Sequence, residues 1–230
     1  MENKLLCDDE NELLKFIKEN EDKYNEKIKH VNDNINGRVC MTNYLFSLLA
    51  IKEFLGVNCK NYLEIGTLWG GSVCSLMQLD TNYNTNFFCI DIFNGYYGKK
   101  CYKNDGNKTN IDVDESNHLE IVRNNINKFN QHQNNFYLIK GKSNETLQEF
   151  KKISDNIDLL FIDGDHSEKA VLEDFELYSK LMKKDGILVF DNYGSAGWPG
   201  VKQAVDKINF EDYNFKRLFI IGESYILKKL

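Results

Sequence analysis

The chain has 230 residues, of which 42% are hydrophobic, with a net charge of −6 and an isoelectric point near 5.3. These values suit one folded domain and exclude a disordered chain. The acidic balance is the opposite of the basic surface typical of nucleic-acid-binding proteins, so we expect no nucleic-acid partner.

The cysteines and the N-terminus point to a reducing environment. Six cysteines occur without a Cys-x-x-Cys pair, which argues against a zinc site. Cys59, Cys74 and Cys89 lie in or beside core-like segments and are predicted to be buried thiols. No apolar run suits a signal peptide or a membrane span. We therefore predict a cytoplasmic protein with no membrane partner.

Taken in chain order, the first predicted elements are helices. Residues 8–30 predict an amphipathic helix that runs into a solvated segment, and residues 41–55 predict a largely buried helix. Strand and helix patterns then alternate. The predicted strands are 60–65, 86–91, 136–140, 157–163, 186–191, 215–221 and 225–228. The predicted helices are 71–79, 116–129, 143–153, 167–183 and 199–208. This alternation indicates a parallel sheet with helices on both faces, closed by an antiparallel hairpin.

Residues 94–115 interrupt this alternation. The stretch is polar, contains glycine and tyrosine, and follows the carboxyl end of the second predicted strand. Ligands bind at that edge of such sheets, so we predict an active-site lid. The alternative is a disordered surface insertion.

Residues 62–72, Tyr-Leu-Glu-Ile-Gly-Thr-Leu-Trp-Gly-Gly-Ser, form the most informative motif. Gly66 and Gly70 frame a tight turn between a strand and a helix that begins near Ser72. A turn of this kind presents backbone N–H groups to a nucleotide-like ligand. The dinucleotide fingerprint Gly-x-Gly-x-x-Gly is absent, because Leu68 stands where its middle glycine would be. This argues against a nicotinamide-dependent oxidoreductase and favours a nucleoside without a diphosphate, such as S-adenosylmethionine.

Three polar residues complete the predicted nucleoside site. Asp91 ends the second strand, where a carboxylate can accept both hydroxyl hydrogens of a ribose. Ser72 can bind a ligand carboxylate near the helix start, and Ser143 can meet the adenine. Each residue alone is better explained as a turn glycine, a helix cap or a solvated strand end. The prediction therefore depends on Glu64, Gly66, Gly70 and Asp91 occurring together.

A second set of polar residues follows two later strands. Asp163 and His166 follow the predicted strand 157–163, and Asp191 and Asn192 end the next strand. Neighbouring parallel strands lie about 4.8 Å apart, so these ends converge. Asp163, Asp191 and Asn192 then offer oxygen ligands suited to Mg²⁺. The alternative is that Asp163 caps the next helix and Asp191–Asn192 forms a turn.

Histidine can act as a base near neutral pH, and His166 lies close to the predicted metal ligands, so we predict that it is the general base. The alternative is that His166 is an ordinary residue on a helix face. His30, His118 and His132 lie in charged helical or loop contexts and are predicted to be solvated.

Together these residues resemble the class I S-adenosylmethionine-dependent methyltransferases. The resemblance is to the metal-dependent small-molecule O-methyltransferases, which include catechol, caffeoyl-CoA and macrolide-sugar O-methyltransferases and the cephalosporin-hydroxylase-like branch. It covers about residues 37–228 and depends on the motifs at 64–72, 91, 141–143, 161–166 and 191–193. It implies an α/β fold, a Rossmann-like doubly wound sheet of seven strands in the order 3-2-1-4-5-7-6 with the last strand antiparallel. An N-terminal helical cap (1–55) would precede the methyltransferase domain (56–230).

The resemblance also assigns roles to residues. The S-adenosylmethionine residues would be Glu64, Gly66, Thr67, Gly70, Ser72, Asp91, Ser143 and Asp163. Mg²⁺ or another divalent cation would bind Asp163, Asp191 and Asn192. The catalytic residues would be His166 and Asp163, although catechol and caffeoyl-CoA enzymes have a lysine at the position of His166.

The implied reaction is methylation of a hydroxyl on a small molecule. Trp198–Val205 resembles the sugar-modifying branch, which favours a sugar or natural product. The alternatives are a catechol-like phenol acceptor, a metal-independent methyltransferase, or a non-catalytic module that binds a nucleoside or glycan. A homodimer, with residues 1–55 at its interface or over the active site, is a further expectation.

Overall fold

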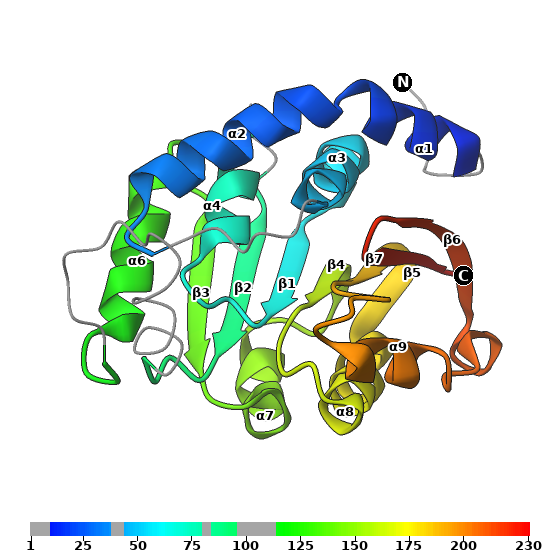
Figure 1. The fold of residues 1–230 in the computed structure, drawn as a ribbon. Coiled ribbons are helices and arrows are strands. Elements are labelled where there is room, and N and C mark those ends of the chain that lie inside the picture. The colour runs from blue at the N-terminus through cyan, green and yellow to red at the C-terminus, as the bar shows by residue number, and fades with distance from the viewer. Residues whose placement is uncertain (1–9, 38–43, 80–83, 96–113) are drawn as a thin grey trace.

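The computed structural model describes residues 10–37, 44–79, 84–95 and 114–230, and its centre is a sheet of seven strands (Figure 1). The strands lie in the order β3-β2-β1-β4-β5-β7-β6. Their bounds are β1 (Asn61–Ile65), β2 (Asn86–Asp91), β3 (Asn135–Lys140), β4 (Ile157–Ile162), β5 (Met182–Phe190), β6 (Phe215–Ile221) and β7 (Ser224–Lys229). The first five strands are mutually parallel, and β7 is antiparallel to both β5 and β6. The predicted strand order is confirmed.

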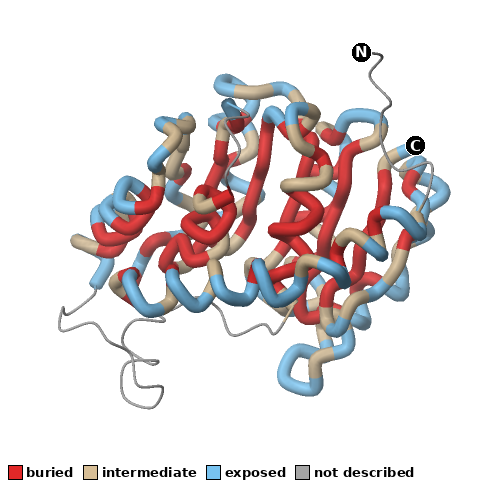
Figure 2. The backbone as a smooth tube through the Cα atoms, turned by 90° about the horizontal axis from the view of Figure 1, so that it is seen from above, coloured by how far each residue is buried: buried red, intermediate tan, exposed pale blue. Residues whose placement is uncertain are grey.

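Helices cover both faces of this sheet because successive strand residues point to opposite sides. On one face, Tyr62 and Phe87 pack with α3 (Leu45–Leu55), α4 (Gly71–Met77) and α6 (His118–Phe129). On the other face, Leu63 and Phe88 pack with α7 (Ser143–Ile153), α8 (Glu168–Tyr178) and α9 (Pro199–Val205). Figure 2 shows the strands as the buried centre and exposed residues along the outer helices. The doubly wound architecture is therefore confirmed.

The N-terminal helices α1 (Glu10–Glu19) and α2 (Glu21–Asn34) lie across α3 (Figure 1). Leu13, Ile17, Tyr24 and Val31 are fully buried and belong to the same apolar cluster as one face of the sheet. The Tyr24 hydroxyl also donates a hydrogen bond to Glu53 of α3. The division of the chain into a cap and a catalytic domain stays a prediction.

The region between β4 and β5 differs from its predicted form. We predict a helix over 167–183, but α8 ends at Tyr178, a 3₁₀ turn, η2 (Ser179–Leu181), follows, and β5 begins at Met182. Met182 pairs with Ile157, whereas Ile187 pairs with Leu159, so the pairing register shifts between these two positions. The residues across the shift are charged or glycine and do not form an apolar run, so the sequence pattern shows only the regular pairing, which begins near the predicted residue 186.

The remaining short 3₁₀ elements are η1 (Gly56–Asn58) and η3 (Phe210–Tyr213). Cys59, Cys74 and Cys89 are buried free thiols, as predicted. Among the described residues, no helix combines the length and apolar character needed to cross a bilayer.

Candidate active site

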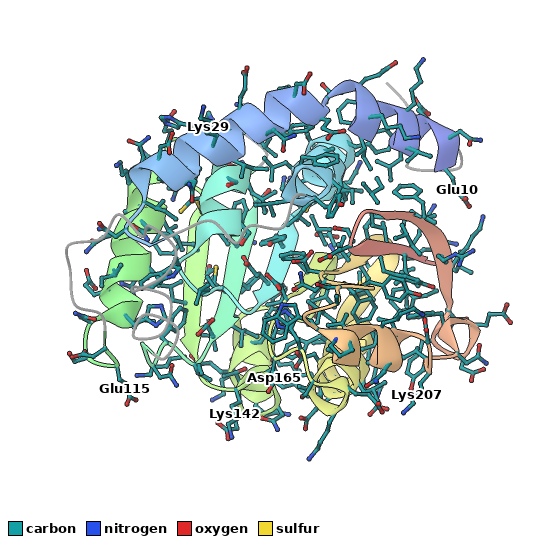
Figure 3. The ribbon with its side chains drawn as sticks, in the orientation of Figure 1. Glu10, Lys29, Glu115, Lys142, Asp165 and Lys207 are labelled. Atoms are coloured by element: carbon teal, nitrogen blue, oxygen red, sulfur yellow. The ribbon has the colours of Figure 1, made fainter. Side chains whose placement is uncertain are left out.

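A cleft of about 860 Å³ lies at the carboxyl ends of the central strands. This volume falls in the range of about 300–1,000 Å³ typical of small-molecule sites. Lys142 and Asp165, two of its lining residues, are labelled in Figure 3. Most predicted site residues line the cleft: Glu64, Gly66, Thr67, Ser72, Asp91, Ser143, Asp163, His166 and Asn192. Gly70 and Asp191 are not among the lining residues.

The turn at 66–70 lies at the cleft and contains three residues with positive φ angles, which few residues other than glycine adopt. Gly66 has φ +94°, and a Cβ atom there would lie 2.0 Å from the Asp163 carbonyl oxygen. Gly70 has φ +76° and packs against Val122 and Ile126 of α6. Both positions therefore require glycine, Gly66 for close approach to β4 and Gly70 for the turn into α4. Leu68, between them, has φ +47°, which is uncommon for a residue with a side chain.

Asp91 holds this turn to the end of β2. Its Oδ2 accepts a 2.8 Å hydrogen bond from the Leu68 amide, and its Oδ1 accepts one of 2.8 Å from the Phe93 amide. Each carboxylate oxygen keeps further acceptor capacity, because an ionised carboxylate offers about four lone-pair sites. The carboxylate is thus fixed in place at the cleft and can still accept hydroxyl hydrogens.

Glu64 is a buried acid beneath the turn. It accepts hydrogen bonds from the Ser72 hydroxyl and, over 3.2 Å, from the Tyr62 hydroxyl. Burial raises the pKa of Glu64 to about 8, although the bond from Ser72 opposes the shift. The Ser72 hydroxyl therefore contacts a carboxylate of the protein itself. Its predicted role in binding a ligand carboxylate stays a prediction.

Ser143 makes a similar contact on the other side of the cleft. Its hydroxyl donates to Asp174 of α8, which is buried, and burial raises the pKa of Asp174 to about 7. Asp174 also lines the cleft, so the structure adds a buried acid beside the predicted adenine residue. Sequence reasoning missed it because Asp174 is one of several acids on α8, and only its burial separates it from them.

The predicted metal ligands follow two neighbouring strands. The Asp163 amide donates to the Ile65 carbonyl and the Asp191 amide donates to the Ile162 carbonyl, so both residues continue the sheet ladder directly after their strands. Their side chains consequently meet at one end of the sheet. Asp163 does not cap α8, because Ser167 is the N-cap of that helix.

Both acids, Asp163 and Asp191, have raised pKa values. Burial and then the Asp91 charge raise the pKa of Asp163 to about 8. Burial and then Asp163 raise the pKa of Asp191 well above its ordinary value. The Asp191 Oδ2 atom is buried and finds no hydrogen-bond partner in the part of the chain that the structure describes. A buried carboxylate oxygen without a partner is costly and marks a place where a cation or donor would be stabilising.

His166 lies beside this pair. Its Nε2 is 3.1 Å from Asp163 Oδ1, and its ring lies 4.5 Å from the ring of Trp198. Burial lowers the pKa of His166, so the imidazole is neutral near pH 7 and can accept a proton. Asn192, with φ +59°, donates from its amide to Glu223 over 3.4 Å.

The donor set fits a hard cation. Asp163, Asp191 and Asn192 supply carboxylate and amide oxygens, the groups that Mg²⁺ prefers. In the described part of the chain, no cluster of three or more His, Cys, Asp or Glu side chains is arranged to hold a metal. The predicted set has only two acids, so any ion here would take its other ligands from Asn192, water or substrate.

One prediction about histidine is wrong. His118 is expected to be solvated, but it is 2% exposed and lines the cleft. Its ring contacts the Leu68 carbonyl and the Gly95 amide. Its spacing could have shown this: His118, Val122, Asn125 and Phe129 follow one another at intervals of four, three and four residues, and all are buried on α6. The predicted lid at 94–115 falls mostly on residues 96–113, which lie outside the described residues.

The sheet order and the cleft define the class I S-adenosylmethionine-dependent methyltransferase fold. Comparison with known proteins supports this assignment. A methyltransferase-domain family model matches residues 63–193, more than half of the chain. The chain belongs to this methyltransferase-domain family, and it is an S-adenosylmethionine-dependent methyltransferase.

Three individual proteins that this chain resembles share 30% or less of its sequence. An uncharacterized protein of Acanthamoeba polyphaga mimivirus is 30% identical over 207 residues, covering 87% of this chain and 78% of the relative. An O-methyltransferase from Bacillus cereus, solved with S-adenosylhomocysteine, has a TM-score of 0.58 and 18% identity, with 91% and 89% of the chains covered. CalS11, a TDP-rhamnose 3′-O-methyltransferase of calicheamicin biosynthesis, has a TM-score of 0.59 and 16% identity, with 92% and 93% covered. At these identities the structures establish the fold.

Proposed function

We propose that this protein transfers the methyl group of S-adenosylmethionine to a hydroxyl of a small molecule, a sugar or natural product, with Mg²⁺ bound at the reaction site. The observation that carries the proposal is the pair Asp163 and Asp191 beside His166, in which the buried Asp191 Oδ2 has no hydrogen-bond partner among the described residues. This pair adjoins the turn at Gly66, because Gly66 packs on the Asp163 carbonyl.

S-adenosylmethionine supplies an electrophilic methyl group on a sulfonium centre. In our proposal the turn from Gly66 to Gly70 gives the cofactor close access to the backbone, and Asp91 accepts its ribose hydroxyls. Ser143 and the adjacent Asp174 lie at the adenine end of the cleft. The cofactor would therefore span the carboxyl ends of β1, β2 and β3.

Asp163, Asp191 and Asn192 would hold the Mg²⁺ ion. When bound, the ion would lower the pKa of the acceptor hydroxyl. Two observations support this assignment. The Asp191 oxygen has no partner among the described residues, and the pKa values of both acids are raised, so a divalent cation would offset their mutual repulsion.

His166 would receive the proton that leaves the acceptor. The neutral imidazole can accept it, and Nε2 lies 3.1 Å from Asp163 Oδ1, so the two side chains can hold that proton between them. The rest of the rate enhancement would come from holding the acceptor oxygen in line with the methyl group.

The acceptor end of the cleft supports a ring-shaped polar substrate. Trp198 is 45% exposed, lines the cleft and packs on His166. The same cleft is lined by Ser195, Asn192 and Glu223, which can bond several hydroxyls. The fold shared with a TDP-rhamnose methyltransferase agrees with a sugar but does not select one.

The first test is calorimetry of the purified protein with S-adenosylmethionine, with Mg²⁺ and then with EDTA, followed by a methyl-transfer screen of sugars and catechols. We expect micromolar cofactor binding, a Mg²⁺ heat that Asp163→Ala removes, and EDTA-sensitive transfer to a sugar hydroxyl. Transfer that survives EDTA would refute the Mg²⁺ assignment, and transfer only to catechol would replace the sugar by a phenol. Homodimerisation, the cytoplasmic location and the lack of a nucleic-acid partner stay predictions.

A further inference from the structure

His118, the first residue of α6, joins two segments that are distant in sequence. Its Nε2 lies 2.9 Å from the Leu68 carbonyl oxygen, and its Nδ1 lies 3.1 Å from the Gly95 amide nitrogen. A backbone amide can only donate, so Nδ1 must be the acceptor and Nε2 must carry the hydrogen donated to Leu68. Only the neutral Nε2–H form of the ring makes both bonds.

The Leu68 peptide is thereby held on both sides. Its N–H donates to Asp91 and its carbonyl accepts from His118. Leu68 also has a left-handed backbone, a conformation that costs about 1 kcal/mol or more and persists only where the surroundings impose it. Two further bonds hold the same turn, from the Gly70 amide to the Thr67 carbonyl and from the Asn125 side chain to the Trp69 carbonyl, but among the bonds of the described residues only those of Asp91 and His118 act on Leu68 itself.

The second segment that His118 contacts is the point where Gly95 and Asp114 lie side by side, which we call the neck. A Cβ on Gly95 would lie 2.6 Å from the Asp114 Cα, and the His118 amide donates to the Asp114 carbonyl over 3.1 Å. The ring itself packs against Trp69 at 4.9 Å and Phe93 at 5.7 Å between centroids. His118 therefore lies between the turn and this neck, with aromatic rings beside it.

We propose that neutral His118 is a positioning residue that holds the 66–70 turn in its cofactor-binding conformation, and that protonation of its Nδ1 weakens cofactor binding. A proton on Nδ1 removes the acceptor for the Gly95 amide and sets two N–H groups against each other. The inference depends on the proposal that the 66–70 turn binds S-adenosylmethionine.

The charges around the ring set the direction of the effect. Burial lowers the pKa of His118, while the Asp91 carboxylate and the Leu68 carbonyl oppose that shift and Lys140 adds to it. Lys140 lies 3.4 Å from Glu115, and the Asp114 carboxylate accepts from the Ser116 amide, so these flanking charges have partners of their own. The ring is neutral at pH 7, and cofactor affinity should fall as the pH drops below the ordinary histidine range.

The test measures S-adenosylhomocysteine affinity by calorimetry from pH 5 to 9 in wild type and three variants. His118→Gln can keep the donor to Leu68, His118→Asn can keep the acceptor for Gly95, and His118→Phe keeps only the ring packing. We expect wild-type affinity to fall about tenfold per pH unit once His118 protonates, and all three variants to lack this acid limb. At pH 7.5, we expect His118→Phe to bind about tenfold more weakly than wild type, with His118→Gln in between.

Thermal melts show whether each variant folds. If no variant folds, ¹⁵N NMR of the His118 imidazole in the wild-type protein replaces the affinity comparison, and we expect it to show the Nε2–H form. Glu64 and Asp163 have pKa values near 8, so their effects belong to the alkaline limb, which the variants share. Three outcomes would overturn this inference and leave the proposed cofactor site standing. They are an acid limb that persists in His118→Phe, an affinity of His118→Phe within twofold of wild type, and an Nδ1–H ring in the NMR experiment. Absence of binding to wild type at every pH would overturn the proposed cofactor site as well.

Discussion

Replacing Glu64 with glutamine should stabilise the apoprotein while weakening its cofactor binding. Glu64 is 1% exposed and accepts hydrogen bonds from Ser72 and Tyr62. Glutamine has the shape of the protonated acid and can keep a hydrogen bond to each neighbour. It cannot ionise, so it avoids the cost of a buried charge.

The magnitude follows from the pKa of Glu64, which burial raises from 4.5 to about 8. A carboxyl group whose pKa is raised on folding stabilises the folded state at low pH and loses that contribution as pH rises through the folded pKa. Each pKa unit is about 1.36 kcal/mol, so between pH 6 and pH 9 wild type should lose about 3 kcal/mol relative to Glu64→Gln. For a chain of this size the gap corresponds to a relative Tm shift of about 6–12 °C.

The assay is chemical and thermal unfolding of both proteins at pH 6 and pH 9, without cofactor or divalent cation. Glu53→Gln is the matched control, because Glu53 also accepts a hydrogen bond from a tyrosine hydroxyl. Unlike Glu64, the Glu53 side chain is 22% exposed and forms an ion pair with Lys23 at 2.8 Å. It should show no gain at pH 9. A stability difference between wild type and Glu64→Gln that does not widen from pH 6 to pH 9 would refute the reasoning.

Three further substitutions test other parts of the structure. Gly66→Ala places a Cβ 2.0 Å from the Asp163 carbonyl oxygen at φ +94°, so it should cost at least about 3 kcal/mol in unfolding free energy and abolish cofactor binding. Its control is Gly194→Ala, at φ +81° with no atom of the described residues within 4 Å of the added Cβ, which should cost only about 1–2 kcal/mol. Equal melts would contradict this. Asn61→Ala breaks side-chain bonds at the amino end of the sheet and should cost about 1–3 kcal/mol without changing the calorimetric affinity for S-adenosylhomocysteine; a changed affinity would contradict this. Asp191→Asn should remove the Mg²⁺ heat yet raise the apoprotein Tm, because it neutralises a buried side chain whose Oδ2 has no partner within the described ranges. An undiminished heat would exclude Asp191 as a ligand.

The sheet could be predicted because its signals are local. Each strand is a short apolar run bounded by polar residues, and parallel order follows from the helices between them. The acids Asp91, Asp163 and Asp191 could be placed for the same reason, since a residue that ends a strand or directly follows it lies where the carboxyl ends of the strands meet. The start of β5 could not be predicted, because Met182 pairs with β4 before a shift of register in a charged stretch. Such a shift depends on the neighbouring strand and not on the sequence of β5 alone.

His118 and Asp174 could not be placed by the same reasoning. Both lie on amphipathic helices with many polar residues, where one residue of rotation decides between solvent and cleft. His118 satisfies its two nitrogens with backbone groups of Leu68 and Gly95, which are 50 and 23 residues away in sequence. Such partners exist only after the sheet has formed, so a sequence pattern can show the buried face but not the hydrogen bonds.

The buried acids explain why the site is costly to the apoprotein. Glu64, Asp163 and Asp191 all have raised pKa values, and for each the main cause is burial. Uncompensated acids of this kind lower stability at neutral pH, so folding alone would favour their replacement. A sulfonium cofactor and a divalent cation would each bring positive charge to this cluster. The charge that destabilises the empty cleft is therefore the charge that would favour these two ligands.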